Sequence, residues 1–160
     1  MSVIFTTAQR KDISEILEMM ADFYAIDNYP FDAVVNQKNL ERFLKGDNLG
    51  RLYLIREGSN TVGYIVLTFG FSFEYGGRDA FIDEFYLKPA YRAKGIGTKT
   101  MEFVEQAALT LDIIALHLEV ENHNERANQL YIRRGFTGNN RSLLTKKIKS
   151  TNSDNSYISE

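Results

Sequence analysis

Two adjacent acidic residues stand inside an apolar segment and need a chemical explanation. Residues 81–87, FIDEFYL, have the aromatic and aliphatic character of a buried strand, yet they include Asp83 and Glu84. Burial raises the pKa of a carboxyl group toward neutrality, where it becomes a useful general base. We therefore choose Glu84 as the first candidate for a catalytic base and Asp83 as the second. A salt bridge, for instance with Arg78, is the structural alternative.

The two acids need not share one role. Successive side chains of a regular strand point to opposite faces, so Asp83 and Glu84 would separate unless a bulge intervenes. A carboxylate at this place can bind a cationic substrate or remove its proton, and the sequence does not distinguish these tasks. We accordingly treat both residues as candidates for substrate binding, and Glu84 also as a candidate for catalysis.

A basic turn containing two glycines follows the acidic strand. Pro89 ends the strand, and the turn RAKGIG leads into the helical pattern of residues 96–108. Glycines let backbone N–H groups converge on a ligand, and the start of a helix adds unpaired N–H groups and a positive dipole end. This arrangement favours a polyanion such as a diphosphate, and a purely structural turn is the alternative. The candidate residues are Arg92, Ala93, Lys94, Gly95, Ile96, Gly97 and Thr98.

Two other kinds of glycine loop fit this turn poorly. A P-loop ends in Gly-Lys-Ser/Thr, whereas this chain has Gly97-Thr98-Lys99. A dinucleotide-binding fingerprint needs a third glycine or alanine at the position of Thr100. A module that binds ATP or NAD is therefore the weaker interpretation.

A second motif lies downstream of the turn. Residues 113–120 read as a strand, and residues 124–136, NERANQLYIRRGF, read as a helix stopped by a glycine. Together the two motifs, Arg-x-x-Gly-x-Gly and Asn-x-x-Ala-x-x-Leu-Tyr-x-x-x-Gly-Phe, resemble those of the Gcn5-related N-acetyltransferases, the GNAT superfamily. The resemblance covers roughly residues 3–148.

The resemblance implies a single α/β domain with the GNAT fold. We expect a mixed, mostly antiparallel, splayed sheet of about six to seven strands flanked by about four helices. Strands are predicted near residues 3–6, 51–56, 61–69, 81–87 and 113–120, with a further hairpin over 70–80 and a last strand over 141–148. Helices are predicted from residue 11 or 12, over 32–45, after the glycine turn and after residue 124.

The resemblance also implies an activity and roles for particular residues. The protein would transfer the acetyl group of acetyl-CoA directly to a primary amine of a small cationic acceptor, without a metal. A non-catalytic acetyl-CoA sensor, or an acetyltransferase of protein lysines or N-termini, is the alternative. Tyr131 would be the general acid near the CoA sulfur, although a core tyrosine is possible, and Asn124 would touch pantetheine. Phe85 and Leu87 would bind the cofactor through their main chain, with a strand bulge around residues 85–87 polarising the acetyl carbonyl.

The segment between the first two predicted helices, by analogy with the family, lies beside the acceptor. Residues 24–32, YAIDNYPFD, break the helical pattern with aromatic, acidic and turn-forming residues. Asp27, Tyr29 and Phe31 are therefore candidates for substrate binding, with a plain helix connector as the alternative. Acidic residues near the expected cleft, including Glu119, weakly indicate a cationic acceptor.

Composition sets the remaining limits. The chain has 160 residues, a formal net charge of −2, a pI of about 5.8 and no cysteine. This argues against nucleic-acid or anionic-membrane partners and excludes disulfides and thiolate zinc sites. Two histidines are too few for a histidine metal triad. We expect one domain over residues 1–149, a disordered polar tail over 150–160, a cytoplasmic location and a possible homodimer.

Overall fold

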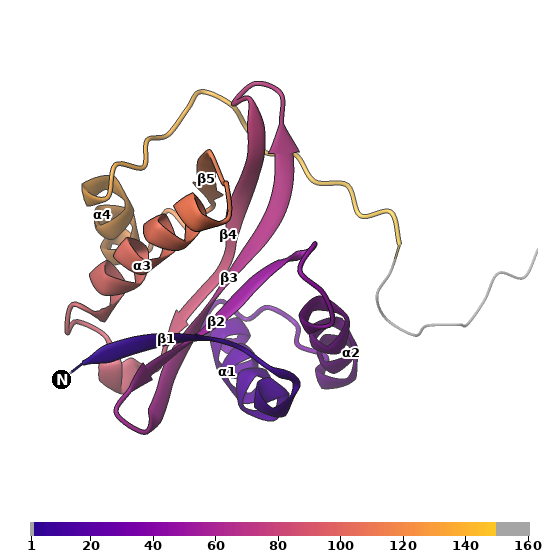
Figure 1. Cartoon of the computed structure of the whole chain (residues 1–160), viewed down its shortest axis with the longest axis vertical. Helices are drawn as coiled ribbons and strands as arrows, with labels where there is room; N and C mark the ends of the chain where they lie inside the picture. The colour runs from indigo at the N-terminus through magenta and orange to yellow at the C-terminus, as the bar shows by residue number, and fades with distance from the viewer. Residues whose placement is uncertain (1, 150–160) are drawn as a thin grey trace, which may run out of the picture.

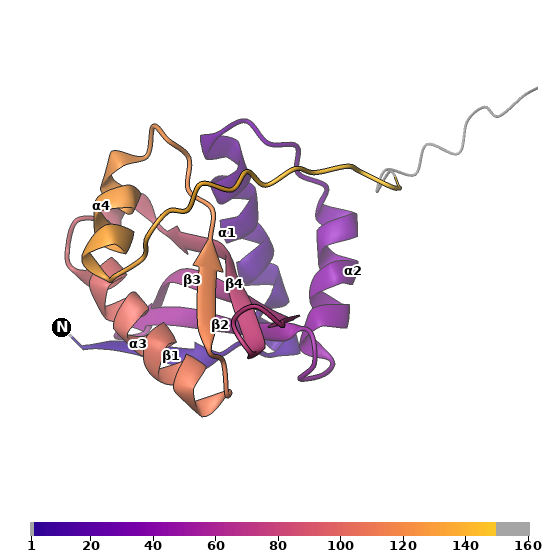
Figure 2. The ribbon, with the colours of Figure 1, turned by 90° about the horizontal axis from the view of Figure 1, so that it is seen from above.

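Within the part of the chain that the structure describes, five strands form one mixed sheet whose spatial order follows the sequence. We describe residues 2–149 in a computed structural model (Figures 1 and 2). Neighbouring strands pair antiparallel from the first to the fourth, and the fifth is parallel to the fourth. The strands are β1 (Val3–Thr7), β2 (Gly50–Glu57), β3 (Asn60–Ser72), β4 (Gly77–Leu87) and β5 (Ala115–Leu118).

Four helices cover the two faces of this sheet. A short 3-10 turn, Arg10–Asp12, leads into α1, and a second one, Pro89–Tyr91, follows β4. Figures 1 and 2 show α1 and α2 on one face and α3 and α4 on the other. The helices are α1 (Ile13–Ile26), α2 (Ala33–Leu44), α3 (Ile96–Thr110) and α4 (Glu125–Arg133).

Two apolar layers, one on each side of the sheet, position the site. Successive residues of β2 and β3 alternate between them, as the strand period of two requires. Leu54 and Val66 pack with Met19 of α1, whereas Ile65 packs with Met101 of α3. The central strands are therefore buried on both faces, which explains their nearly continuous apolar sequence.

The acidic pair lies at a β-bulge in β4. Val66 of β3 pairs with Glu84, and the next residue, Leu67, pairs with Ile82, so that Asp83 is the extra residue of β4. An extra residue interrupts the strict alternation of side chains. Regular alternation, which would have separated Asp83 and Glu84, therefore does not apply here.

The sheet splays immediately after this bulge. Pairing between β4 and β5 extends only over residues 79–82 of β4 and residues 115–118 of β5. Among the residues that the structure describes, β4 has no strand neighbour on its β5 side from Asp83 to Leu87. The splay confirms the expected GNAT architecture and opens the middle of the sheet.

The strand count is lower than predicted. The hairpin expected over residues 70–80 is the distal part of β3 and β4, because each strand continues through its full length without a break. The strand predicted over residues 141–148 was wrong, since this segment runs extended and exposed with no strand pairing. Its apolar residues, Leu143, Leu144 and Ile148, do not alternate regularly, and a strand also needs a hydrogen-bonding partner. The predicted disorder of residues 150–160 lies outside the described residues.

No helix in residues 2–149 is long and apolar enough to cross a membrane. The same residues contain no group of three or more His, Asp or Glu side chains placed to hold a metal ion.

Candidate active site

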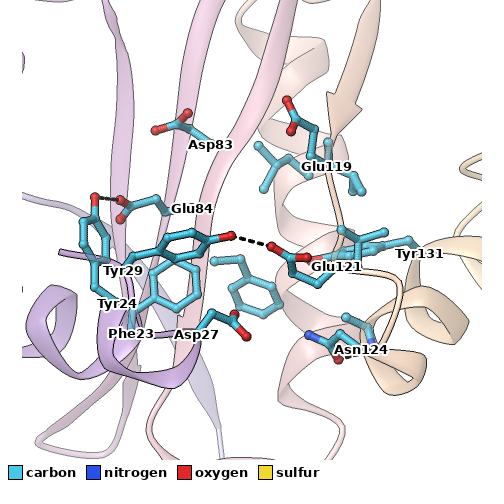
Figure 3. Close-up of a pocket in the computed structure, with 15 residues that line it drawn as sticks. Phe23, Tyr24, Asp27, Tyr29, Asp83, Glu84, Glu119, Glu121, Asn124 and Tyr131 are labelled. Atoms are coloured by element: carbon cyan, nitrogen blue, oxygen red, sulfur yellow. Dashed lines mark hydrogen bonds between the residues drawn. The ribbon is translucent and has the colours of Figure 1, made fainter. Parts of the chain in front are cut away.

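A cleft of about 500 Å³ opens where β4 and β5 separate (Figure 3). Its walls come from the C-terminal end of α1, the middle of β4, the segment after β5, and α4. None of the lining residues, all within the described part of the chain, is Lys, Arg or His. The carboxylates that line it are Asp27, Asp83, Glu84, Glu119 and Glu121.

Two tyrosines hold the carboxylate of Glu84. The hydroxyl of Tyr24 donates to Oε1 at 2.6 Å, and the hydroxyl of Tyr64 donates to Oε2 at 2.7 Å. Burial raises the pKa of Glu84, the nearby charge of Asp83 adds to this effect, and the two tyrosine hydrogen bonds oppose it, with a net upward shift. Glu84 is thus a fixed carboxyl group that holds a proton more readily than an exposed glutamate does.

The carboxylate of Asp83 is available to a ligand. Because of the bulge, its side chain also lines the cleft, and partial burial raises its pKa. Within residues 2–149, no side-chain hydrogen bond or ion pair holds the carboxylate of Asp83. Arg78, considered above as a partner for this pair, instead donates to the carbonyl of Leu111 at 3.2 Å.

Tyr131 projects from α4 into the same cleft. Its ring packs against Phe136, with ring centroids 5.8 Å apart, and joins the apolar layer beneath α3. Burial raises the pKa of its phenol to about 12, so the hydroxyl remains protonated at neutral pH. A protonated phenol facing a cleft can donate a hydrogen bond to a developing anion.

Asn124 has a structural task as well as a place in the cleft. It is the N-cap of α4, and its Oδ1 accepts a hydrogen bond from the backbone N–H of Ala127 at 3.2 Å. Such a cap satisfies one of the unpaired donors at the start of a helix. The cap alone accounts for an asparagine here, while the side chain also faces the cleft (Figure 3).

The glycine turn is shaped for contact through its backbone. Ala93 and Gly95 have φ values of 66° and 77°, in the left-handed region. Gly95 is the N-cap of α3, so no side chain occupies the space in front of the first N–H groups of this helix. A Cβ placed on Gly97 would lie 3.1 Å from Cδ2 of Leu130, so this glycine also allows α3 and α4 to approach closely. No acidic residue lies in the first turn of α3, and Ile96 is buried while Thr98 is exposed. The unpaired N–H groups at the start of α3 can thus meet an anion.

The two basic residues of the turn contact neighbouring groups of the protein. Nε of Arg92 donates to the carbonyl of Leu87 at 2.7 Å, and its guanidinium lies 5.5 Å from the ring centroid of Tyr86. The ammonium group of Lys94 lies 5.5 Å from the ring centroid of Tyr91. Arg92 therefore fastens the turn to β4, in addition to supplying charge beside the turn.

Phe85 and Leu87, which we expect to bind the cofactor through their main chain, differ in their position relative to the cleft. Phe85 lines the cleft and Leu87 does not, although both side chains pack against the apolar cluster around Ile55, Val62 and Ile96. The carbonyl of Leu87 already accepts a hydrogen bond from Arg92. The bulge expected around residues 85–87 lies instead at Asp83, because the register of β3 and β4 shifts there.

The segment after α1 reaches across the cleft. The hydroxyl of Tyr29 donates to Oε1 of Glu121 at 2.6 Å, and Nε2 of His123 lies 3.2 Å from Oδ1 of Asp27 (Figure 3 shows the first contact). Phe31 does not line the cleft. Its ring makes an edge contact with Tyr24, with centroids 5.6 Å apart, so it supports a lining residue from behind.

Comparison with known proteins assigns the chain to a family. Residues 14–136 match the acetyltransferase (GNAT) family. The chain belongs to this family. Over 139 residues it is 28% identical to the thialysine N-epsilon-acetyltransferase of Sus scrofa, covering 81% of each chain.

Solved structures agree with the assignment. An integron cassette protein from the mobile metagenome of Cole Harbour Salt Marsh is 34% identical, with a TM-score of 0.82 and 91% of each chain covered. A predicted acetyltransferase from Clostridium acetobutylicum, solved with acetyl-CoA, shares the fold at a TM-score of 0.76 and 17% identity, with 91% of this chain and 96% of that chain covered. This GNAT protein is therefore an acetyl-CoA-dependent N-acetyltransferase.

The features of this GNAT chain fit acetyl-CoA in two places. The start of α3 has converging backbone donors and no competing acidic side chain, which suits a diphosphate. The unpaired edge of β4 next to the splay suits an extended, amide-containing arm, because such an arm can add to a sheet edge as a strand does.

Sequence reasoning missed two residues that line the GNAT cleft, Tyr24 and Glu121, and the buried Tyr64 behind it. Tyr24 and Tyr64 are distant in sequence from the Glu84 that they hold, and a tyrosine in an apolar segment is equally typical of the core. Glu121 follows the β5 strand and gives no signal beyond its charge. Only the hydrogen bond from Tyr29 to Glu121 shows that Glu121 belongs to the site.

Proposed function

We propose that this GNAT enzyme acetylates the primary amine of a small cationic acceptor. The observation that carries the proposal is the charge of the cleft, in which all the ionisable lining side chains are carboxylates or tyrosines. A group of carboxylates in a partly closed cleft, with no basic residue among the lining side chains, attracts ammonium groups and repels anions. The similarity to an enzyme named for the acetylation of a side-chain amine supports a primary amine as the group that is acetylated.

The substrate amine must lose a proton before it can attack a thioester. An ordinary alkylammonium has a pKa of ~10.4, so presenting its neutral form at pH 7 costs ~4.6 kcal/mol. Glu84 is suited to receive this proton, directly or through water, because its raised pKa brings it nearer to neutrality. Tyr24 and Tyr64 fix the orientation of its carboxylate.

Asp83 has the complementary task of binding the cation. Its carboxylate lines the cleft beside Glu84 but does not share the two tyrosine hydrogen bonds. A free carboxylate can form a charge-assisted hydrogen bond with an ammonium group. Asp83 would thus hold the acceptor while Glu84 takes its proton.

Tyr131 assists the departure of the thiolate. Acetyl-CoA supplies the thioester carbonyl and the leaving thiol. With a pKa of about 12, the Tyr131 phenol is a weaker acid than a thiol of pKa ~8.5, so it stabilises the sulfur by donating a hydrogen bond while solvent supplies the final proton. Holding both reactants in one cleft can itself contribute ~7–11 kcal/mol through proximity.

A free-thiol assay with acetyl-CoA tests this proposal. The panel contains polyamines, alkyl diamines, amino acids, aminoglycosides and lysine-containing peptides, and each acetylated product is identified by mass spectrometry. We expect turnover with at least one small cationic amine and none with neutral alcohols. Calorimetric binding of acetyl-CoA without acetylation of any amine, or acetylation of peptides alone, would contradict the proposal.

A further inference from the structure

A second cavity adjoins the acidic cleft on the side of α2. Its volume is about 230 Å³, and it shares Tyr24, Asp83 and Glu84 with the cleft. Its other walls come from α1, α2 and the facing parts of β2 and β3. The shared residues make the two cavities neighbouring parts of one acidic region. The remaining lining residues are Met20, Asn36, Asn39, Leu40, Phe43, Leu52, Val66 and Thr68.

This second cavity combines an apolar wall with oxygen-bearing side chains. Met20, Leu40 and Phe43 provide surface that suits a methylene chain. The side-chain amide nitrogen of Asn36 already donates to the carbonyl of Asp32 at 2.9 Å, which leaves its Oδ1 as an acceptor. Asn39 and Thr68 add one carbonyl oxygen and one hydroxyl.

No basic side chain lines the second cavity, as none lines the cleft, within the described residues. An acceptor that carries a carboxylate would therefore meet Asp83 and Glu84 without a counter-charge. Like charges brought together in a partly buried site are strongly unfavourable. A second ammonium group would instead find a carboxylate and several neutral acceptors.

We propose that the second cavity binds the distal ammonium group of a diamine or polyamine whose other amine reacts in the cleft. Asp83 lines both cavities, so its carboxylate would bind the distal ammonium group while Glu84 takes the proton of the reacting amine. This inference rests on the proposed function and narrows it. It assigns Asn39 and Thr68 as specificity-determining residues and excludes free diamino acids as preferred acceptors.

Three acceptors of equal chain length separate these possibilities. Cadaverine has two amines, pentylamine lacks the distal amine, and lysine is cadaverine with an added carboxylate. We expect kcat/KM for cadaverine to exceed that for both others by about tenfold or more, which corresponds to ~1.4 kcal/mol. Putrescine, butylamine and ornithine form a second set, so the comparison does not depend on one chain length.

Substitutions in the second cavity provide an independent test. Thr68→Val and Asn39→Leu remove polar acceptors while keeping similar volumes, and we expect each to raise KM for cadaverine several-fold, about threefold or more. The pentylamine kinetics of both variants should stay unchanged. Gln37→Leu is the matched control, since Gln37 lies on α2 but pairs with Glu41 and does not line the cavity.

The outcomes test the second-cavity assignment separately from the proposed function. Turnover that favours cadaverine, with loss of this preference in Thr68→Val and Asn39→Leu, supports the inference. Turnover that favours lysine, or variants that affect pentylamine and cadaverine equally, would overturn the second-cavity assignment while leaving the proposed function intact. No turnover with any of the amines, while acetyl-CoA binds, would overturn the proposed function itself.

Discussion

The two sides of the splay at β4 present opposite chemistry to a ligand. On the α3 side, the glycine turn offers backbone N–H groups and the positive end of a helix, with Arg92 and Lys94 close by. On the α1 side, the cleft offers carboxylates from three separate segments of the chain, and Asp83 and Glu84 mark its centre. One side is suited to an anion and the other to a cation.

This difference shows why the two sides were not equally predictable. The anion side depends on the backbone of one continuous turn, so the spacing of its glycines carries the information. The cation side depends on side chains such as Tyr24, Tyr64 and Glu121, which meet only through the fold. Each side can be disrupted separately.

The largest effect is expected on the anion side, from Gly97→Glu. The new side chain would meet Leu130, 3.1 Å from the ideal Cβ, and would place a negative charge in the first turn of α3. We expect acetyl-CoA affinity to fall by about 100-fold or more, measured by calorimetry, because like charges in contact cost several kcal/mol.

Gly138→Glu is the control for charge alone, since nothing lies within 4 Å of a Cβ at that glycine. The acetyl-CoA affinity of Gly138→Glu should match that of the unaltered protein. Unchanged affinity in Gly97→Glu would show that the turn does not bind the cofactor.

The next largest effect is expected on the cation side, from Glu84→Gln. Removing a general base lowers kcat by roughly 10²-fold or more, while acetyl-CoA affinity should be unchanged. The pH profile gives the sign: the base works only when deprotonated, so kcat/KM of the unaltered enzyme falls as pH drops through the raised pKa of Glu84. In Glu84→Gln that acidic limb should be absent, and the lost activity should partly return at high pH.

The stability of Glu84→Gln adds a second readout. The folded protein binds the Glu84 proton more tightly than the unfolded chain does, so this group's stabilising contribution is present at low pH and is lost as pH rises through the folded-state pKa. Thermal unfolding of the variant should lack this dependence on pH. Glu57→Gln, at the end of β2 and away from the cleft, is the control. If the dependence of kcat/KM on pH is the same in Glu57→Gln and Glu84→Gln, Glu84 is not the base.

The smallest of the three effects is expected from Tyr131→Phe. Tyr131 lines the acidic cleft and also packs in the apolar layer on the α3 side of the sheet. The ring and its contact with Phe136 remain, so folding and acetyl-CoA affinity should be preserved. Loss of one hydrogen-bond donor to the developing thiolate should lower kcat by about 10²-fold or less. Tyr75→Phe, an exposed tyrosine on the β3–β4 hairpin, serves as the control. Equal kcat values for the two variants would remove Tyr131 from the mechanism.

The fold class was readable because its main signals are local. The apolar period of α1, the glycine turn before α3 and the cap at Asn124 each specify a nearby piece of backbone. The number of strands was less readable, because a strand needs a partner as well as a pattern. Residues 141–148 pair with no strand, which is why the predicted last strand was wrong.

The sequence alone determined the family, and it predicted an anion-binding turn and a pair of central acids, since each of these depends on residues close together in the chain. Only the tertiary structure decided where the side chains of those acids lie. The bulge that turns Asp83 into the cleft depends on the register between β3 and β4, and the tyrosines that hold Glu84 arrive from α1 and β3. Register and long-range packing arise from the summed fit of the whole core, so no local pattern specifies them.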